Sequence, residues 1–376
     1  MATGMTTSRP STRDEVRAVL ARARAEGRSV RPVGSGIHLG VGGEPPEDVL
    51  PLPMTGLCRV RSHRPQDWMV TVEAGITLRD LAAALARSGQ MLPLDPWGGY
   101  EATVGGVLAS GLSGPLSTGY GGPGTLTLAL KVILADGRQL ATGAGVIKNV
   151  AGYDLTRLYL GSLGSLGVIA EATLRVHPLP PRREVLLGSY GDAAEAVAAA
   201  RGILVSPLRP EAVEILRSPG APWQVAVQVA GTERVVARKV RDAMTVLGGA
   251  RGAAPPLVPP AAAVLQLAVP DTDPAAPLEE CARIFPDGSM SLRAGSLAGE
   301  LFLPEAAEDL PDRIDRLRRQ GTTRVTVLRL PARWRGRVDP YGMEPSREER
   351  ALRRMLDPDR ILNPGVHLAD REEPAP

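Results

Sequence analysis

Glycine is concentrated in three stretches of the first half of the chain, and these stretches constrain the fold more than any other feature. Ten glycines lie within the 27 residues 98–124, and two further loops begin at Gly34 and Gly161. Glycine has no Cβ, so its backbone can turn tightly and approach a ligand closely. Successive N–H groups in such turns form an anion-binding nest. Three loops favour a nucleotide-type cofactor with a diphosphate; ordinary tight turns are the alternative.

The first glycine loop, Gly34-Ser-Gly36, follows a predicted strand, which is the setting of a dinucleotide-binding fingerprint. That fingerprint requires a third glycine three residues later, at the start of a helix whose N-terminus holds the pyrophosphate. Here position 39 is leucine, and Pro45 and Pro46 prevent a long helix from starting. No glycine cluster is followed by Lys-Ser or Lys-Thr, which excludes a P-loop. We therefore expect a cofactor cradle of a different kind.

Length and composition indicate a globular protein of two domains, since the 376 residues are 43% hydrophobic and 23% charged. The two cysteines, Cys58 and Cys281, lie far apart, which excludes a disulfide scaffold, an iron–sulfur cluster and a cysteine zinc site. The longest apolar stretch, 255–269, contains four prolines and a glutamine, and residues 1–10 have no apolar core. We therefore expect a cytoplasmic protein with no signal peptide and no membrane span.

The net charge of +3 is carried by 41 arginines and only three lysines against 41 acidic residues. An excess of arginine, alanine, glycine and proline is typical of GC-rich genomes, so this balance says little about partners. Residues 312–354 hold 13 arginines and six acidic residues, which fits either a solvated surface or a docking face for an acidic partner. Aromatic residues do not alternate with these arginines, so we exclude nucleic-acid binding.

Hydrophobic periodicity predicts both helices and strands in the first half of the chain. Thr12 and Glu15 fit a capping box at the start of a helix that ends at Gly27. Asp136-Gly137 is typical of a hairpin turn between two strands. Further strands are predicted at 29–33, 68–73, 126–134, 138–142 and 168–176, and a further helix at 77–89.

After prolines at 178, 180 and 181, the pattern changes to the β-α-β-β-α order of a ferredoxin-like unit. Its elements are predicted at 184–187, 193–203, 212–216, 223–229 and 233–247, with later strands at 289–293, 300–303 and 324–328 and a helix at 310–319. We therefore predict an α+β protein whose second domain contains an antiparallel sheet. The predicted boundaries are 1–180, 181–355 and a C-terminal segment 356–376, with disorder from about Leu368.

Several short motifs taken together resemble those of the FAD-linked oxidases of the vanillyl-alcohol oxidase, or PCMH, type. Within this family they are most similar to the FAD-binding (E) subunits of bacterial glycolate oxidases. The resemblance is dense over 12–178, local over 356–366 and limited to the layout elsewhere. The motifs are Arg31-Pro-Val-Gly-Ser-Gly36, Val72-Glu-Ala-Gly-Ile-Thr-Leu78, Leu92-Pro-Leu-Asp-Pro96, Ala102-Thr-Val-Gly-Gly106, Ala135-Asp-Gly137, Lys148-Asn-Val-Ala-Gly-Tyr-Asp-Leu155, Gly161-Ser-Leu-Gly-Ser-Leu-Gly-Val-Ile169 and Asp357-Pro-Asp-Arg-Ile-Leu-Asn-Pro-Gly365.

The resemblance implies a PCMH-type FAD-binding domain at 1–180, an α+β cap domain at 181–355, and a C-terminal segment that returns to the first domain. It also implies that the stretch 148–154 lies near the cofactor, although Tyr153 and Asp154 have an equally good structural interpretation, and a plain turn explains Asn363 equally well. The implied FAD-binding residues are Pro32, Val33, Gly34, Ser35, Gly36, Ile37, His38, Leu94, Pro96, Thr103, Val104, Gly105, Gly106, Ser110, Gly111, Gly164, Val168 and Ile169.

The chain departs from the family pattern at two positions of the first glycine loop. Ser35 replaces the middle glycine of the usual triple-glycine loop, which narrows the nest. Members with covalently attached flavin carry histidine where this chain has Ile37, and His38 lies one place later. We therefore predict non-covalent FAD and interpret His38 as a hydrogen-bonding loop residue.

Flavin-dependent oxidation of a 2-hydroxy acid requires a base for the hydroxyl proton and a cation for the carboxylate. Relatives of this kind use a histidine and metal cluster in the cap, but no histidine lies in 183–356. We therefore expect no metal and no catalytic base in this chain. Arg333, Arg335 and Arg347 are either carboxylate-binding groups or solvated surface residues.

The resemblance implies an FAD-carrying subunit of a glycolate oxidase-like complex, which works with a catalytic flavoprotein subunit and an iron–sulfur subunit. Through these partners we expect cytoplasmic or peripheral inner-membrane localisation. The second hypothesis is a stand-alone flavin oxidase or dehydrogenase of a small 2-hydroxy acid. The third hypothesis is a non-catalytic scaffold with a degenerate FAD fold, for which the altered glycine loop is the one sequence argument.

Overall fold

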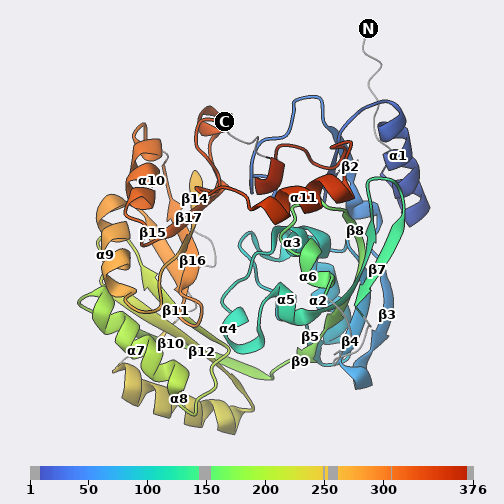
Figure 1. Ribbon diagram of the computed structural model, residues 1–376. Coiled ribbons are helices and arrows are strands. Elements are labelled where there is room, and N and C mark those ends of the chain that lie inside the picture. Colours follow the sequence, from blue (N-terminus) through green and yellow to red (C-terminus); the bar gives the residue numbers. More distant parts are fainter. Residues whose placement is uncertain (1–8, 144–153, 249, 253–260, 306, 371–376) are drawn as a thin grey trace.

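The computed structural model describes residues 9–143, 154–248, 250–252, 261–305 and 307–370. Within these ranges the chain forms two main sheets with helices packed on them, one from each half of the sequence (Figure 1). The mixture of helices and antiparallel strands confirms the predicted α+β fold class. Of the helices in the described part of the chain, none is both long and apolar enough to cross a membrane.

The first sheet is antiparallel in the order β3-β4-β8-β6-β7, and helices pack on both of its faces. Val168 and Ala170 of one strand pack with Leu20 of the first helix, whereas Ile169 belongs to the core on the opposite face. This alternation follows from the two-residue period of a strand. The strands are β3 (Val60–Arg64), β4 (Met69–Glu73), β6 (Thr127–Ile133), β7 (Gln139–Gly143) and β8 (Val168–Arg175).

Helices and short strands complete this half of the molecule. Threonine hydroxyls cap three of these helices, because Thr12, Thr77 and Thr103 each accept a hydrogen bond from an N–H in the first turn. The helices are α1 (Arg13–Ala25), α2 (Leu78–Ala86), α3 (Val104–Ser110), α4 (Ser117–Tyr120), α5 (Pro123–Leu126) and α6 (Thr156–Tyr159). The short strands are β1 (Val30–Val33), parallel to β2 (Leu50–Pro53), and β5 (Gln90–Met91), antiparallel to β9 (His177–Pro178).

The second sheet consists of two β-α-β-β-α-β units placed side by side, in the order β13-β10-β12-β11-β15-β16-β14-β17. The first unit confirms the predicted ferredoxin-like order, and the second repeats it. The first unit comprises β10 (Arg182–Tyr190), α7 (Ala193–Val205), β11 (Ala212–Arg217), β12 (Trp223–Gly231), α8 (Glu233–Leu247) and β13 (Ala250–Gly252). The second comprises β14 (Ala263–Ala268), α9 (Ala275–Ile284), β15 (Ser289–Arg293), β16 (Ala298–Leu303), α10 (Leu310–Arg319) and β17 (Arg324–Arg329).

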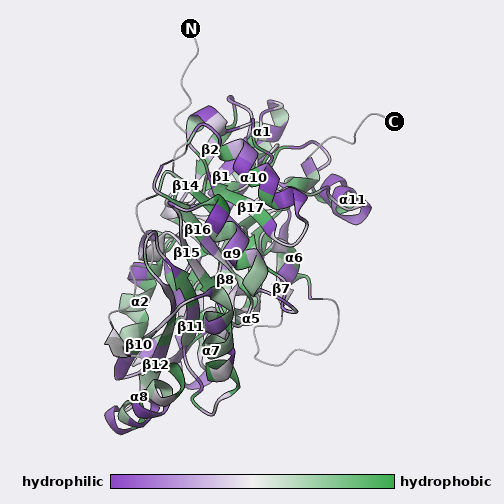
Figure 2. Ribbon diagram, turned by 90° about the vertical axis from the view of Figure 1, so that its left-hand side faces the viewer, coloured by the Kyte–Doolittle hydropathy of each residue, from purple (hydrophilic) through white to green (hydrophobic). Residues whose placement is uncertain are grey.

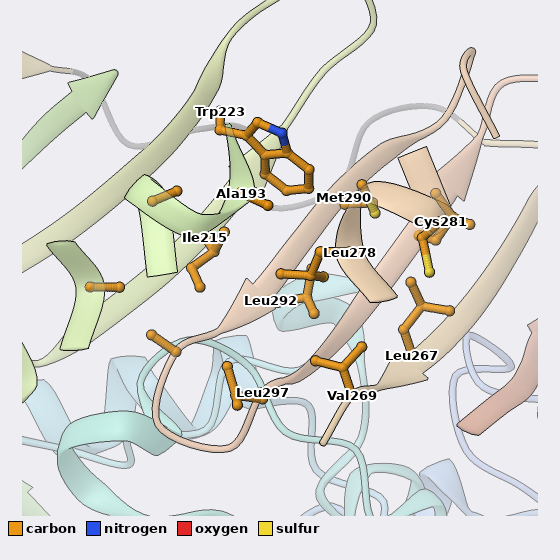
Figure 3. Packing of buried hydrophobic residues seen from close by; sticks show 14 of the residues in the cluster. Ala193, Ile215, Trp223, Leu267, Val269, Leu278, Cys281, Met290, Leu292 and Leu297 are labelled. Atoms are coloured by element: carbon orange, nitrogen blue, oxygen red, sulfur yellow. The ribbon is translucent and has the colours of Figure 1, made fainter. Parts of the chain in front are cut away.

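Helices α7 to α10 cover one face of this sheet and bury the larger hydrophobic core. Figure 3 shows part of it, with Leu278 and Cys281 of α9 beside Leu292 of β15 and Leu267 of β14. The outward faces of α8 and of the C-terminal helix are hydrophilic (Figure 2). The other face of the sheet is therefore the one available to the first half of the chain.

Partly buried polar contacts join the two halves across that face. Tyr120 of α4 donates a hydrogen bond to Glu211, next to β11, at 2.5 Å. Arg293 of β15 donates to the carbonyl oxygen of Ser113 at 2.8 Å. Because these groups are partly withdrawn from water, losing either contact is costly, and the contacts therefore help to fix the relative position of the halves.

The C-terminal segment packs against the first half of the chain. Leu362 forms a parallel bridge with Val30, and α11 (Arg347–Leu356) contacts the same side through Arg353, whose guanidinium donates to the carbonyl oxygen of Ser165 at 2.6 Å. The prediction of disorder from Leu368 is wrong for the first three residues. Leu368–Asp370 form a short 3-10 helix with two buried side chains, and Asp370 pairs with Arg353.

Besides the short strand β13, three elements of the second half were not predicted. Prolines hide two of them, because β14 follows a Pro/Ala-rich stretch and α9 carries Pro277 in its first turn. The third, α11, is highly charged, although Ser346 and Glu349 form a capping box that the sequence displays. We interpret the Pro-, Ala- and Gly-rich stretch 251–260 as a loop; its first two residues belong to β13, and the rest lies outside the described residues, as do the cofactor-side stretch 148–153 and the tail 371–376.

Candidate cofactor cleft and interface cavities

A narrow cleft lies between the glycine loop that follows β1 and helix α3. The bridge to Leu362 brings the C-terminal segment to the rim of this cleft. Its lining therefore comes from four places in the sequence. The lining residues are Arg31, Pro32, Gly34, Ser35, Gly36, Ile37, His38, Leu39, Val41, Thr103, Gly106, Ala109, Ser110, Leu163, Asn363 and Val366.

The glycine loop presents successive backbone N–H groups without backbone partners. Among the described residues, the amides of Ser35, Gly36, Ile37 and His38 donate no hydrogen bond to the backbone, whereas Leu39 closes the turn onto the carbonyl oxygen of Gly36 at 3.2 Å. Such a run of N–H groups fits an anion, because each gains a hydrogen-bond acceptor that the protein does not provide. This is the nest expected from the glycine pattern.

Two buried side-chain atoms at the cleft also lack hydrogen-bond partners in the described structure: Arg31 Nε, a donor, and Asn363 Oδ1, an acceptor. Asn363 adopts a φ of 45° and donates from Nδ2 to the carbonyl oxygen of Leu163 at 2.6 Å, which fixes its side chain. Native proteins satisfy most buried polar atoms, so these two indicate a missing polar ligand. The residues present therefore fit a diphosphate-containing cofactor.

Gly34 is needed here for space, since a Cβ at this position would lie 2.1 Å from Thr103 Oγ1. Thr103 in turn caps α3, where its Oγ1 accepts from the Gly106 N–H at 3.2 Å. The backbone of the glycine loop at Gly34 is therefore packed directly against the side chain of Thr103. A larger residue at position 34 must displace one of them.

The structure brings some of the predicted FAD-binding residues together and places others elsewhere. Pro32, Gly34, Ser35, Gly36, Ile37, His38, Thr103, Gly106 and Ser110 line the cleft. Pro96 lines a neighbouring cavity, Gly111 is the left-handed cap of α3, and Gly164 packs on Pro32. The side chains of Val33, Leu94, Val104, Val168 and Ile169 and the backbone of Gly105 do not line the cleft.

The amides at the start of α3 are already used within the protein. The N–H of Val104 donates to Ile76, that of Gly105 to Ala74, and that of Gly106 to the Thr103 side chain. A Cβ on Gly105 would lie 2.8 Å from the Ala74 Cβ, so this glycine serves helix packing. In this structure these three N–H groups are therefore not free to make the expected backbone contacts to a cofactor.

His38 links the glycine loop to the loop that follows β5. Its Nε2 lies 2.7 Å from the carbonyl oxygen of Trp97, so that nitrogen carries the hydrogen. Burial lowers the pKa of His38, which keeps the imidazole neutral. The residue is thus a hydrogen-bonding loop residue, in the role predicted from the sequence.

Two cavities lie between the halves of the molecule, beyond Trp97. The larger, of about 380 Å³, is mostly apolar, and the smaller, of about 130 Å³, is more polar. Asp95, Pro115 and Glu214 line both, so they stand where the two cavities meet. No histidine lines either cavity.

Three carboxyl groups, which we call the interface carboxyls, are grouped here: Asp95, Glu214 and Glu300. Arg293 donates to both oxygens of Glu300 at 3.2 Å, and it lies opposite Glu214 in the register of β11 and β15. Glu214 accepts one hydrogen bond, from Ser291. Asp95 Oδ2 accepts from the backbone, but its Oδ1 is buried without a partner in the described structure. The positive charge of Arg293 thus acts on all three carboxyl groups.

Burial raises the pKa of Asp95 to about 8, although the N–H of Leu116 and the charge of Arg293 oppose the shift. Burial also raises the pKa of Glu214 and of Glu300. Withdrawal from water disfavours the ionised form, and neighbouring carboxylates disfavour it further. At neutral pH at least one of these groups, Asp95, is therefore mostly the neutral acid.

Asp95→Asn should make the protein more stable in alkaline solution. The folded pKa of Asp95 lies above its ordinary value near 4, so its contribution to stability is complete below about pH 4 and is lost as the pH rises to about 8. Asparagine has no charge to bury, so we expect a free energy of unfolding about 1–3 kcal/mol higher than that of the wild type at pH 9.

The measurement is urea denaturation of both proteins from pH 4 to pH 9, with the exposed Asp273→Asn as control. The difference between wild type and Asp95→Asn should shrink steadily toward pH 4, where Asp95 is neutral in the folded state and about half protonated in the unfolded state. A difference that does not change with pH would contradict this account of Asp95.

The three arginines singled out as possible carboxylate-binding groups lie away from these cavities. Arg333 stacks near Trp334 and is half exposed, with Glu308 at 3.6 Å. Arg347 is exposed on α11, and Arg335 lines a third cavity beside Gly40. Arg31 and the interface carboxyls were not among the site residues predicted from the sequence. An acidic residue inside an apolar strand, as in Val213-Glu214-Ile215, was the available signal.

Comparison with known proteins indicates the cofactor of the part of the chain that forms most of the cleft. Residues 7–143, which include the glycine loop and the start of α3, match the family model of the FAD binding domain. This part of the chain thus resembles an FAD binding domain. This confirms FAD as the cofactor predicted from the sequence, while its non-covalent attachment stays a prediction.

The chain is similar in sequence to FAD-linked oxidoreductases. It is 42% identical over 148 residues to glycolate oxidase subunit GlcE of Escherichia coli (strain K12), a match covering 36% of this chain and 42% of that protein. It is 30% identical over 210 residues to subunit GlcD of Bacillus subtilis (strain 168), covering 56% and 45%. It is 32% identical over 207 residues to the mitochondrial D-lactate dehydrogenase [cytochrome] of Arabidopsis thaliana, covering 55% and 36%. The chain thus spans less than half the length of these relatives.

Solved structures share the fold of nearly the whole chain. Alkyldihydroxyacetonephosphate synthase matches with a TM-score of 0.71 at 18% identity, over 94% of this chain and 75% of that one. Substrate-bound p-cresol methylhydroxylase matches with a TM-score of 0.71 at 16% identity, over 96% and 88%. These matches confirm the predicted PCMH-type fold.

Proposed function

We propose that this protein is the FAD-carrying subunit of a glycolate oxidase-like oxidoreductase complex. The observation that carries the proposal is the cleft itself: a run of N–H groups without backbone partners and the orphaned Arg31 Nε within the residues that match the FAD binding domain, with Asn363 Oδ1 of the C-terminal segment beside them. The 42% identity to GlcE over 148 residues supports the choice of subunit. Because that match covers 36% of this chain, most of the chain is interpreted from its own residues.

Bound FAD would supply a two-electron acceptor that can pass electrons on singly. The residues of this chain would hold it without covalent chemistry. The N–H groups of 35–38 would bind the diphosphate, and Arg31 Nε and Asn363 Oδ1 would provide one donor and one acceptor. Ile37 at the position of a histidine anchor supports non-covalent attachment. His38 would keep the Trp97 loop against the cleft.

The charged side chains that line the interface cavities indicate that a 2-hydroxy acid is oxidised elsewhere in the complex. The carboxylate of glycolate or lactate needs a cation that is free to pair with it. Arg183 of the larger cavity is already bonded to Glu211 at 2.7 Å, and Arg293 is held by Glu300. A second anion in these cavities would meet more carboxyl groups than free cations. The proposed partners are therefore a catalytic flavoprotein subunit, which takes the acid, and an iron–sulfur subunit, which accepts the electrons.

Turnover by the isolated chain distinguishes this proposal from a stand-alone dehydrogenase. We expect the FAD-loaded chain to reduce an artificial electron acceptor with glycolate or D-lactate no faster than without substrate. We expect the complex purified through a tag on this chain from its own cells to do so, and to carry iron and a second flavin. Substrate-dependent turnover by the isolated chain would favour the stand-alone enzyme, and a purified complex without iron would contradict the proposed partners. Cofractionation with the cytoplasm or the inner membrane tests the proposed localisation.

A further inference from the structure

The cofactor cleft is narrow, with a volume of about 70 Å³. Sites that hold small molecules measure roughly 300–1,000 Å³, and FAD, with its two ring systems, is a large ligand. FAD therefore cannot enter the cleft unless one of its walls moves. The contacts behind each wall indicate which one that is.

Three walls of the cleft are built on hydrophobic cores. Val30, just before the glycine loop, packs in the core that contains Leu20 of α1, and Val107 of α3 packs in the core on the opposite face of the first sheet. Leu163 packs against a further core, to which Val41 belongs. Moving any of these walls takes apolar side chains out of a core, which is costly.

The fourth wall is the segment 363–370, which we call the strap. Its residues Asn363 and Val366 line the cleft. The last side chain of the C-terminal segment that belongs to a core is Leu362. Three buried side chains of the strap belong to none of the hydrophobic cores in the described part of the chain: Val366, Leu368 and Ala369. The strap can therefore detach without opening a core.

Polar contacts join the strap to both halves of the molecule. The carbonyl oxygen of Val366 accepts a hydrogen bond from the N–H of Gly43 at 2.9 Å, and it also accepts one from the hydroxyl of Tyr341, which belongs to the second half. At the other end of the strap, Asp370 pairs with Arg353 of α11 at 2.7 Å. Tyr341 does not line the cleft, so we expect it to affect FAD only through the strap.

We propose that the strap closes the cofactor cleft and that residues 363–370 detach together each time FAD enters or leaves. The proposal rests on FAD binding at this cleft, which is part of the function proposed above, but not on the activity or the partners. Proteins open locally at their least stable parts, and ligand-binding segments are drawn from these parts. Through Tyr341, the second half of the chain supports the closed strap.

This arrangement has a kinetic consequence. A change that weakens the strap without touching the rest of the cleft favours opening of the FAD-free and the FAD-loaded protein alike. FAD loading and FAD release should then become faster by the same factor. The dissociation constant should stay unchanged as long as the strap is mostly closed. Damage to the site itself would instead speed release without speeding loading.

The test measures FAD loading and release by stopped-flow flavin fluorescence, in the full chain after removal of its flavin. Tyr341→Phe removes one hydrogen bond of the strap, so we expect both rates to rise about fivefold. Asp370→Asn breaks the ion pair at the other end, so both rates should rise at least as much. Tyr190→Phe is the matched control, because Tyr190 of β10 also donates to a carbonyl oxygen, that of Leu247 at 3.0 Å. It should leave both rates unchanged.

Hydrogen exchange measured by mass spectrometry identifies the segment that moves. Residues 363–370 should exchange faster in Tyr341→Phe than in the wild type, whereas α3 should exchange at the same rate in both. Unchanged loading and release in both strap variants would overturn the proposal, and so would faster release without faster loading or unchanged exchange of 363–370. A chain that takes up no FAD at all would contradict the cofactor site on which the proposal rests.

Discussion

Gly34→Ala should weaken FAD binding by about 100-fold. The new Cβ would lie 2.1 Å from Thr103 Oγ1, a distance that forces the glycine loop or the start of α3 to move. Overpacking of this kind costs about 1–3 kcal/mol, and each 1.4 kcal/mol is a factor of ten in affinity. The backbone at position 34 suits an alanine, so the effect is steric and local. The affinity is measured by titrating FAD into the apoprotein and following flavin fluorescence.

A second substitution separates this steric explanation from general damage. Thr103→Ala removes the atom that the new Cβ meets first, so the double variant should lose less FAD affinity than the two single variants added together. Gly124→Ala in the same domain is the matched control, because its Cβ would meet nothing closer than 4.0 Å. Additive losses in the double variant would mean that Thr103 is not the contact that matters.

Arg353→Met should lower the free energy of unfolding by about 3–5 kcal/mol. Arg353 is almost fully buried and bonds two carboxylates, Asp357 and Asp370, each at 2.7 Å. It also donates to the carbonyl oxygens of Ser165 and Leu362. Removing the cation leaves two buried carboxylates without their partner, which is more costly than the pair itself is stabilising. Urea denaturation at pH 7 measures the loss.

The same substitution should weaken FAD binding, because Arg353 holds the residue before Asn363 against the cleft. Arg354→Met is the matched control, since Arg354 is exposed on the same helix and its loss should change stability by less than about 0.5 kcal/mol. Equal stability of the two variants would show that the buried network does not hold the C-terminal segment in place.

Much of the cleft could be predicted because its determinants are local in sequence. A glycine loop after a strand, and a threonine that caps a glycine-containing helix, are each specified within a few residues. The use of the amides at the start of α3 could not be predicted, because their acceptors, Ile76 and Ala74, come from a separate segment. The family motifs therefore predict the region of the cofactor site better than they predict which backbone groups contact the cofactor.

The interface cavities could not be predicted, because their residues meet only through the topology of the second sheet. Asp95, Glu214 and Glu300 come from different elements, and the pairing of β11 with β15 brings Arg293 beside them. That pairing joins two repeated units, and the second unit was incomplete in the sequence analysis because β14 and α9 follow proline-rich segments. The sequence shows the acidic residue Glu214 within an apolar strand, but it does not show which residues lie beside it in the fold.

The visible absorption spectrum of the purified chain tests the central claim most directly. We expect a flavin spectrum, and we expect denaturation followed by filtration to release all of the flavin as FAD, since Ile37 provides no attachment through its side chain. The same experiment on Gly34→Ala should give a nearly colourless protein. A colourless wild-type chain that takes up no added FAD, or flavin that remains attached to the denatured chain, would contradict the account of the cleft as a non-covalent FAD site.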